Sequence, residues 1–377
     1  VSAMRVLFTC GGTGGHINPA LAVAKMLAAR QPEAQIRFAG AKHGMEAKLV
    51  PAEGFPLDLV DVEGFSHKLS FSGISQNVRA ARKTCRSLRW ARQVLDAFSP
   101  DVVVGTGGYA CFPILYTASK RHIPTIIHES NAYPGLVTRT LARRMDRVLV
   151  NFAKTAEYLG NRSNITVSGM PIREDMIYKE RAEARRELGL DDRPLIVSFW
   201  GSLGAREMNR AIARFIAMET REDRFSHIHA TGRFGYAWMP EYIASLGVDL
   251  AAHPNIDLRE YIHDMPRVMA AADLVICRGG ASTLSELAAL GKPAIIVPSP
   301  NVSANHQEKN AGVFAAAGGA VLLRERDATP ERLFQTASEL LSQPERLADM
   351  SRALHGIAVL DGCERIYREI MALARKR

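Results

Sequence analysis

Each half of the sequence begins with the same unit, in which a short apolar run is followed by a glycine-containing loop and a stretch with helical periodicity. In the first half, residues 5–10 predict a strand, residues 11–16 form the loop, and residues 19–30 predict a helix with its proline in the first turn. In the second half, residues 195–200 predict the strand and residues 201–205 the loop. Strands that alternate with helices indicate parallel sheets built from βαβ units. The repeated unit therefore predicts two similar α/β domains in tandem.

The length and composition of the chain allow two ordinary domains. It has 377 residues, of which 47% are hydrophobic and 23% charged, so each half can bury a core of its own. The predicted domains are residues 1–169, with a final helix over 361–377 that packs back on them, and residues 170–360. The other predicted strands span 35–39, 102–105, 125–128, 147–150 and 165–168 in the first domain and 227–231, 256–260, 274–277, 294–298 and 320–323 in the second.

The first glycine loop, Gly11-Gly12-Thr13-Gly14-Gly15-His16, favours a ligand that approaches the backbone closely. Glycine takes conformations closed to other residues, and the helix that follows presents free N–H groups to an anion. The loop is not a dinucleotide fingerprint, because Ile17 stands where the third glycine is required and Ala39-Gly40 replaces the expected acid. The sequence also has no phosphate-binding loop of the NTPase type. A strand-to-helix turn without a ligand is the alternative.

Polar and glycine residues follow two further strands of the first half. Gly107 and Gly108 allow a second close approach of backbone to ligand, or they simply start a helix. His128, Glu129 and Asn131 end another predicted strand, where they suit proton transfer or the binding of sugar hydroxyls. Local turn chemistry is the alternative for these three residues.

The loops of the second half suit a nucleotide sugar. Ser202 opens a helix, where it suits a diphosphate or acts as an N-cap. Glu286 can accept hydrogen bonds from ribose hydroxyls, although Thr283 and Glu286 also have the spacing of a capping box. The amides from Asn305 to Asn310 suit sugar hydroxyls, or they form an ordinary polar first turn.

Several classes of site are disfavoured by the sequence. It has no D-x-D pair and no spaced Cys/His set, so we expect no metal and no other cofactor. We then expect helix N-termini and backbone N–H groups to stabilise the charge on the leaving group. The five cysteines form no C-x-x-C pair, which favours a reducing cytoplasm. We see neither a signal peptide nor an apolar run of 18 residues.

A basic stripe marks the first half. The net charge is +9, and no acidic residue lies between Glu63 and Asp96. Basic residues at helical spacing beside apolar groups indicate a surface for an anionic membrane, and no nucleic-acid motif accompanies them. A solvated helix face is the alternative. The predicted membrane surface comprises Arg79, Arg82, Lys83, Arg86, Arg89 and Trp90.

In their order along the chain, these motifs resemble those of the MurG family of peptidoglycan glycosyltransferases. The resemblance spans nearly the whole chain and is specific because it is an ordered set rather than one loop. The matching segments are 11–16, 18–22, 107–109, 128–131, 169–173, 201–206, 281–286 and 306–310.

The resemblance implies a GT-B fold, in which two Rossmann-like doubly wound domains face each other across a cleft. It implies inverting, metal-independent transfer of N-acetylglucosamine from UDP-N-acetylglucosamine to lipid I, which is undecaprenyl-diphospho-N-acetylmuramoyl-pentapeptide, to form lipid II. The place implied is the cytoplasmic face of the cell membrane, with cell-wall assembly proteins as further partners.

The resemblance also implies roles for individual residues. His16 is the expected general base on the acceptor hydroxyl, with Glu129 and His128 as alternatives. Arg173 and Ser202 would hold the diphosphate, and the backbone of Ile262 would bind uracil. The remaining donor contacts would come from Thr13, Gly14, Gly15 and Asn131 near the sugar, from Ala281, Ser282, Thr283, Leu284, Ser285 and Glu286 along the nucleotide, with Glu286 on ribose, and from Gln307 on sugar hydroxyls.

The sequence departs from the family pattern at two positions, and two other functions are compatible with it. Trp200 stands where family members often have glycine, and Ser130 where glutamine is common, although neither change removes an expected ligand group. The first rival is another GT-B enzyme, with a different lipid acceptor or with UDP-sugar 2-epimerase activity. The second is a UDP-sugar-binding scaffold without activity.

Overall fold

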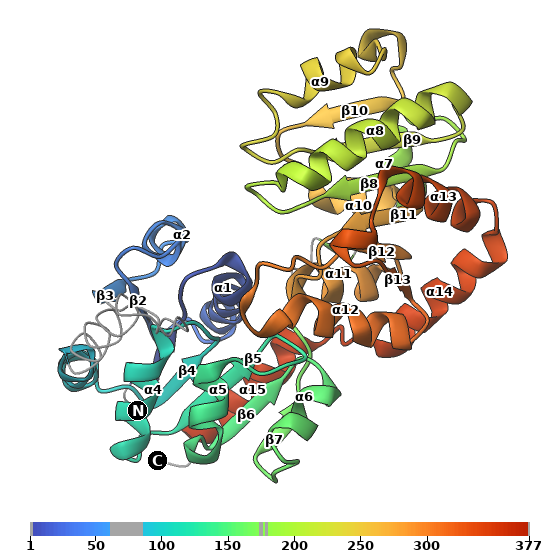
Figure 1. Cartoon of the computed structure of the whole chain (residues 1–377). Helices are drawn as coiled ribbons and strands as arrows, with labels where there is room; N and C mark the ends of the chain where they lie inside the picture. The colour runs from blue at the N-terminus through green and yellow to red at the C-terminus, as the bar shows by residue number, and fades with distance from the viewer. Residues whose placement is uncertain (1–2, 61–85, 173–175, 178–179, 376–377) are drawn as a thin grey trace, which may run out of the picture. The chain divides into compact units, whose positions relative to one another are not determined.

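The computed structural model describes residues 3–60, 86–172, 176–177 and 180–375. The chain forms two compact units, each with its own parallel sheet (Figure 1). The first unit is Val1–Ile172 together with Val359–Arg377, and the second is Arg173–Ala358. The prediction of a fold with two doubly wound α/β domains is confirmed.

The first unit contains a seven-stranded sheet in the order β3-β2-β1-β4-β5-β6-β7. The chain moves outward in one direction from β1 and then in the other from β4, so the carboxyl ends of these two strands form the switch point where open sheets bind ligands. The strands are β1 Arg5–Thr9, β2 Gln35–Ala41, β3 Leu57–Val60, β4 Val102–Gly105, β5 Thr125–Glu129, β6 Arg147–Val150 and β7 Ile165–Val167.

The helices of the first unit cover both faces of this sheet, and residues 86–98 are helical as well. Their bounds are α1 Gly14–Arg30, α2 Glu46–Ala52, α4 Cys111–Lys120, α5 Leu136–Leu141, α6 Ala153–Tyr158 and α15 Gly362–Ala374.

The second unit repeats the arrangement with a six-stranded sheet in the order β10-β9-β8-β11-β12-β13. Its switch point lies between β8 and β11. The strands are β8 Leu195–Phe199, β9 Ser226–Ala230, β10 Ile256–Arg259, β11 Leu274–Cys277, β12 Ala294–Ile296 and β13 Ala320–Leu322. The helices are α7 Arg181–Glu187, α8 Arg206–Glu222, α9 Met239–Ser245, α10 Met265–Ala271, α11 Ala281–Leu290, α12 His306–Ala316, α13 Pro330–Leu341 and α14 Pro344–Ile357.

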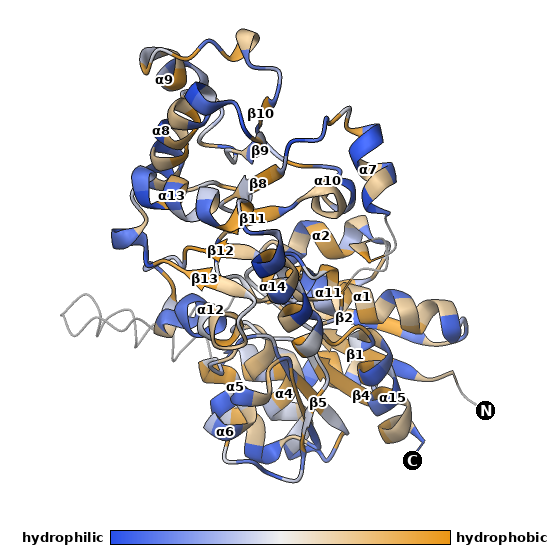
Figure 2. Ribbon diagram, turned by 90° about the vertical axis from the view of Figure 1, so that its right-hand side faces the viewer, coloured by the Kyte–Doolittle hydropathy of each residue, from blue (hydrophilic) through white to orange (hydrophobic). Residues whose placement is uncertain are grey.

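The strands are apolar because helices cover them on both faces. All four residues of β4 and of β11 are buried, as expected for the middle of a parallel sheet. Figure 2 shows this contrast, with largely orange strands and helices that carry blue faces. Among the described residues, no helix combines the length and the apolar character needed to cross a membrane.

The last helix, α15, packs on α1 and β4 of the first unit. Ile366, Ile370 and Leu373 are buried in the same core cluster as Ile17 and Val104. An ion pair of 2.9 Å joins Arg147 to Glu369, and Arg30 pairs with Glu364. The end of the chain thereby completes the core that lies under the first glycine loop.

Two parts of the first unit differ from the sequence prediction. The first helix begins at Gly14 and not at Pro19, so Pro19 lies inside the helix beyond the turn in which proline is favoured. The helix was predicted to start later because glycine has a low helix propensity, which the surrounding packing overrides here. The segments α2 and β3 were not predicted, since each is short and carries only a weak periodic pattern.

Candidate active site

Two glycine loops of the first unit contact each other at the carboxyl ends of β1 and β4. The N–H of Gly11 donates to the carbonyl of Gly107 at 3.1 Å. Gly108 has a φ of +87°, and a Cβ there would lie only 2.3 Å from the carbonyl oxygen of Gly11. No residue with a side chain fits this contact, so the glycines hold two backbone segments together at the switch point.

Glu46 supports the same loop from beneath. Its side chain is fully buried, with one carboxylate oxygen accepting from the N–H of Gly12 at 3.0 Å and the other from the N–H of Ala41 at 2.7 Å. A buried acceptor that satisfies two backbone donors fixes the loop geometry. The sequence does not reveal this role of Glu46, because a buried acid and an exposed one look the same in a sequence.

His16 lies in the first turn of α1, against the second glycine loop. Its Nδ1 is 3.1 Å from the carbonyl oxygen of Gly11, and a Cβ on Gly107 would lie 2.7 Å from its ring. Its backbone carbonyl accepts from the hydroxyl of Thr106 at 2.6 Å. If Nδ1–H donates to Gly11, Nε2 carries the lone pair, and the half-buried ring can accept a proton at that atom.

His128 and Glu129, the alternatives to His16, are occupied by structural hydrogen bonds. His128 is buried, and its Nε2 donates to the carbonyl of Gly169 at 2.9 Å. The carboxylate of Glu129 accepts from the backbone and side chain of Asn131, and its other oxygen accepts from Gly135 and Thr138. Glu129 therefore fixes the conformation of the turn after β5, whereas His128 ties β5 to the segment that follows β7.

The cysteines near the loop are unsuited to nucleophilic chemistry. Burial raises the pKa of the Cys111 thiol to about 12, and burial also raises the pKa of Cys10 well above its usual value. Both side chains therefore remain protonated near neutral pH.

The second unit forms a similar contact between the loops that follow β8 and β9. Gly204 has a φ of +79°, and a Cβ there would lie 2.1 Å from the carbonyl oxygen of Thr231. Gly232 has a φ of +71°, and a Cβ there would lie 2.2 Å from the backbone nitrogen of Gly204. The N–H of Arg233 donates to the carbonyl of Ser202 at 3.1 Å. These contacts fix the loop in front of α8.

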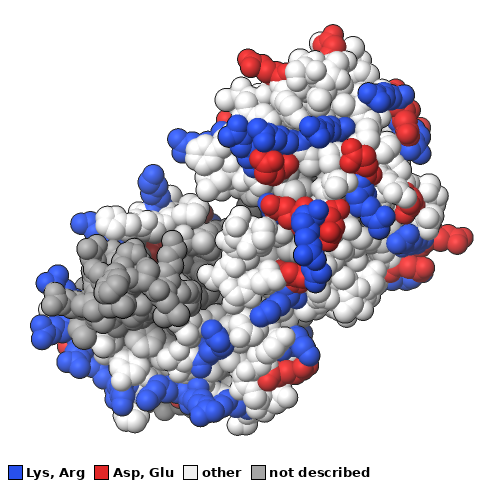
Figure 3. All heavy atoms as spheres, viewed as in Figure 1, with Lys and Arg blue, Asp and Glu red and all other residues white. Residues whose placement is uncertain are grey.

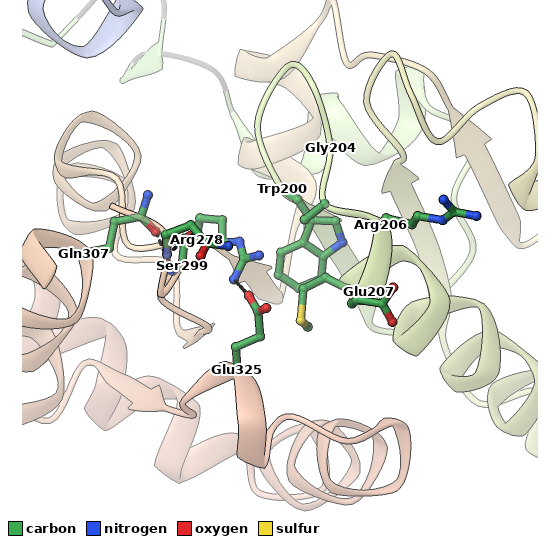
Figure 4. A pocket seen from close by; sticks show the side chains of 11 residues that line it. Trp200, Gly204, Arg206, Glu207, Arg278, Ser299, Gln307 and Glu325 are labelled. Atoms are coloured by element: carbon green, nitrogen blue, oxygen red, sulfur yellow. Dashed lines mark hydrogen bonds and ion pairs between the residues drawn. The ribbon is translucent and has the colours of Figure 1, made fainter. Parts of the chain in front are cut away.

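A pocket of about 380 Å³ opens beside this loop, at the ends of β8 and β11 (Figure 4). Arg278 lines this pocket, and its Nη1 lies 2.5 Å from Oε2 of Glu325. The guanidinium carbon of Arg278 is 5.5 Å from the centre of the Trp200 ring. The pocket therefore combines an aromatic face with a paired cation. Its lining residues are Trp200, Gly204, Ala205, Arg206, Glu207, Met208, Arg278, Ser299, Asn301, Gln307 and Glu325.

Two of the predicted donor-binding segments border the pocket. Gln307 lines it, and the side-chain oxygen of Gln307 accepts from the N–H of Ser299 at 2.9 Å. The N-cap of α8 is Ala205, so Ser202 is not a cap, and its exposed side chain lies in the loop before the helix. The first turn of α8, with Arg206, Glu207 and Met208, also lines the pocket, and the first N–H groups of a helix have no partner within it.

The segment from Ala281 to Glu286 forms the start of α11. The N-cap is Gly280, so Thr283 and Glu286 lie inside the helix and do not form a capping box. The side chain of Asn310 donates to the carbonyl of Gly279 at 3.0 Å, which ties this start to that of α12. Of the rest of the segment, Ser282 and Thr283 are half-buried and Ala281, Leu284 and Ser285 buried. The side chain of Ile262, after β10, is buried.

Some predicted residues lie outside the described part of the chain. These are Arg173 and, on the basic stripe, Arg79, Arg82 and Lys83. Arg86 and Arg89 are described and exposed, whereas Trp90 packs against the core of the first unit. On the face in view, Figure 3 shows many basic and few acidic side chains on the first unit.

Two family models match the chain. The N-terminal domain of glycosyltransferase family 28 matches residues 6–150, and the C-terminal domain of the same family matches residues 195–366. A protein of Acetivibrio thermocellus is 40% identical over 99% of both chains, and one of Desulforamulus reducens is 40% identical over 93% of both. Both carry the name UDP-N-acetylglucosamine--N-acetylmuramyl-(pentapeptide) pyrophosphoryl-undecaprenol N-acetylglucosamine transferase.

Solved structures agree with this similarity. The crystal structure of Acinetobacter baumannii MurG has a TM-score of 0.77 and 28% identity, and the match covers 98% of this chain and 99% of that one. A UDP-GlcNAc 2-epimerase of Neisseria meningitidis, bound to UDP-GlcNAc, has a TM-score of 0.67 over 98% of this chain and all of that one. Its identity is 15%, so the epimerase shares the fold alone.

The environment of His128 predicts a pH dependence of stability. Burial lowers the pKa of His128 below 6.5, so the unfolded chain binds a proton at this ring more readily than the folded one. Stability is therefore present above pH 6.5 and lost as the pH falls through the folded pKa. His128→Gln can keep the bond to Gly169 without titrating. As the pH is lowered, the free energy of unfolding of this variant should therefore fall less steeply than that of wild type, by up to about 1.4 kcal/mol per pH unit. Urea unfolding of both proteins from pH 7.5 to 5.5 measures this, and parallel curves would contradict it.

Proposed function

The chain belongs to the MurG family, and on this basis we propose that it transfers N-acetylglucosamine from UDP-N-acetylglucosamine to undecaprenyl-diphospho-N-acetylmuramoyl-pentapeptide. The observation that carries the proposal is 40% identity over 99% of the chain to a relative named for this reaction. The loop geometry supports it, because both units hold glycine backbone against the ends of their central strands. Such loops suit a ligand with phosphate and sugar groups.

We propose that the second unit binds the donor. The diphosphate would meet the free N–H groups at the start of α8 and the hydroxyl of Ser202, with Arg173 as a further ligand. The half-buried Glu286 would accept from ribose hydroxyls, and the backbone of Ile262 would bind uracil. Gln307 would bind the sugar, because its amide nitrogen remains a donor while its amide oxygen accepts from the N–H of Ser299. The other contacts to the nucleotide would come from Ala281, Ser282, Thr283, Leu284 and Ser285.

The chemical step in this proposal is a direct displacement with His16 as general base. The acceptor hydroxyl oxygen attacks C1 of N-acetylglucosamine while the bond from C1 to the UDP oxygen breaks, and UDP leaves with the electron pair. The proton of the hydroxyl passes to Nε2 of His16, the ring nitrogen that does not face the carbonyl of Gly11. Thr13, Gly14, Gly15 and Asn131 would contact the transferred sugar. Helix N-termini would stabilise the negative charge on UDP.

We further propose that the first unit binds an anionic membrane through its basic stripe. The exposed side chains of Arg86, Arg89 and Arg92 support this, because they follow one another along the helical segment 86–98, whose one acid, Asp96, is paired with Arg121. Trp90 would contribute through its packing on the core and not through insertion into lipid. A lipid-linked acceptor makes such a surface useful, since the enzyme must meet its substrate at the membrane.

A transfer assay tests the reaction and the role of His16 together. With radiolabelled UDP-N-acetylglucosamine, the lipid-linked acceptor and EDTA, wild-type protein should move label into the lipid fraction. His16→Gln should lower kcat by about 10²- to 10⁴-fold and leave KM for the donor nearly unchanged, because the general base is lost while the donor site remains.

The exposed His43 supplies the control, and His43→Gln should behave as wild type. A wild-type protein that binds UDP but leaves the label on the nucleotide would refute the transferase. A His16→Gln variant within a few-fold of wild-type kcat would refute only the base.

Vesicle binding tests the membrane surface. Replacing Arg86, Arg89 and Arg92 by alanine should weaken binding to vesicles with 30% anionic lipid by about 100-fold, since each basic side chain near such a surface contributes about 1 kcal/mol. The matched control replaces the exposed Arg332, Arg346 and Arg352 of α13 and α14. Equal loss in both triple variants would mean that general charge, and not this surface, drives binding.

A further inference from the structure

Five side chains of the second unit form a continuous chain of buried hydrogen bonds that the proposed function does not use. They come from two strands and one helix, with Ser198 on β8, His227 and His229 on β9, and Asn209 and Glu219 on α8. Each of them is at most 1% exposed. Polar side chains in such a place require a specific hydrogen-bond arrangement, because an unpaired buried polar group is costly.

The chain of contacts runs without a gap from Glu219 to the backbone of Thr231. Glu219 Oε2 lies 2.8 Å from His227 Nδ1, and His227 Nε2 lies 2.7 Å from the hydroxyl of Ser198. The same hydroxyl is 2.6 Å from His229 Nδ1, and His229 Nε2 is 3.3 Å from the side-chain oxygen of Asn209. The side-chain nitrogen of Asn209 then donates to the carbonyl of Thr231 at 2.7 Å.

The carbonyl of Thr231 sets the direction of every bond. It can only accept, so Asn209 must turn its NH₂ group toward it and its oxygen toward His229. His229 therefore carries its proton on Nε2 and accepts from the hydroxyl of Ser198 at Nδ1. Burial lowers the pKa of His229 well below its usual value, which keeps this ring neutral. The hydroxyl of Ser198 in turn accepts from Nε2–H of His227.

This direction leaves one proton between Glu219 and His227. Because Nε2 of His227 already donates to Ser198, the contact of Nδ1 with Glu219 needs a further proton, on either the carboxyl group or the ring. The pair is thus neutral in sum, as its complete burial requires. The Glu219 end of this series of hydrogen bonds is therefore anchored in the core.

The Thr231 end of this series of hydrogen bonds lies under the glycine loops. The carbonyl of Thr231 is the atom that a Cβ on Gly204 would approach to 2.1 Å, and a Cβ on Gly235 would lie 2.2 Å from the side-chain nitrogen of Asn209. Asn209 thus occupies the space between the loop before α8 and the loop after β9. Its position determines where both backbones can lie.

We propose that Ser198, His229 and Asn209 are positioning residues, which hold the carbonyl of Thr231 and thereby set the backbone of the loop 201–205 for the donor diphosphate. The identity of the ligand rests on the proposed function, whereas the direction of the hydrogen bonds does not. A loop that must present several N–H groups to a diphosphate depends on a fixed backbone, because a small displacement misaligns all of them at once.

Kinetics of the full-length protein test the positioning role. Ser198→Ala breaks the chain in the middle, and KM for UDP-N-acetylglucosamine should rise by about tenfold while kcat stays within about twofold. Ser198→Thr keeps the hydroxyl and should restore KM. Ser226→Ala makes the same change at a buried serine of β9 outside the chain and should leave KM unchanged. A Ser198→Ala variant with a lower melting temperature but an unchanged KM would show that these hydrogen bonds are only structural, and it would overturn the proposal. A KM raised equally in Ser198→Thr would overturn it as well.

Histidine ¹⁵N NMR of the wild-type protein tests the hydrogen-bond direction without any variant. His229 should be a neutral ring with its proton on Nε2, and a proton on Nδ1 would overturn the proposal even if Ser198→Ala failed to fold. Failure of the proposed function would look different, since wild type would then transfer no sugar. UDP affinity measured by calorimetry would replace KM in that case, with the same order expected among the variants.

Discussion

Contacts of backbone on backbone at the ends of the central strands are the constraint on which both halves of this molecule depend. In the first unit Gly108 lies against the carbonyl of Gly11, and in the second Gly204 lies against that of Thr231. A single Cβ at any of the close-approach glycines would separate the loops. Parallel sheets bring the ends of neighbouring strands to one edge, and the glycines allow the loops at that edge to be packed tightly.

The helices that follow these loops begin without side-chain caps. The N-caps of α1, α8 and α11 are Thr13, Ala205 and Gly280, and none makes a side-chain cap hydrogen bond. The first N–H groups of a helix have no partner within the helix, and a side chain, water or a ligand can satisfy them. In the proposed donor site these groups of α8 would bind the diphosphate, and the positive end of the helix dipole would favour its negative charge. On this proposal a diphosphate would be held largely by backbone.

The sequence was sufficient for the architecture, and one residue that it singled out, Gln307, lines the pocket of the second unit. The repeated unit of strand, glycine loop and helix predicted both sheets, because parallel strands buried on two faces leave continuous apolar runs. It could not locate α2 or show that Glu46 holds the first loop, since a buried acid and an exposed one look the same in a sequence. The start of α1 was misplaced because glycine signals a loop even where tertiary packing extends a helix through it. The roles of His128 and Glu129 also required coordinates, because only hydrogen-bond partners show that Glu129 holds the turn after β5 and that His128 bonds the backbone of Gly169.

If backbone at the start of α8 holds the donor through its diphosphate, as we propose, then the affinities of UDP, UMP and uridine must differ, and comparing them is the most direct test. Calorimetry on the full-length protein at one ionic strength measures all three. UDP should bind at least about tenfold more tightly than UMP, because the second phosphate adds charge-assisted hydrogen bonds to the helix N-terminus. Equal affinities of UDP and UMP would contradict it and would place the binding energy in the uridine contacts instead.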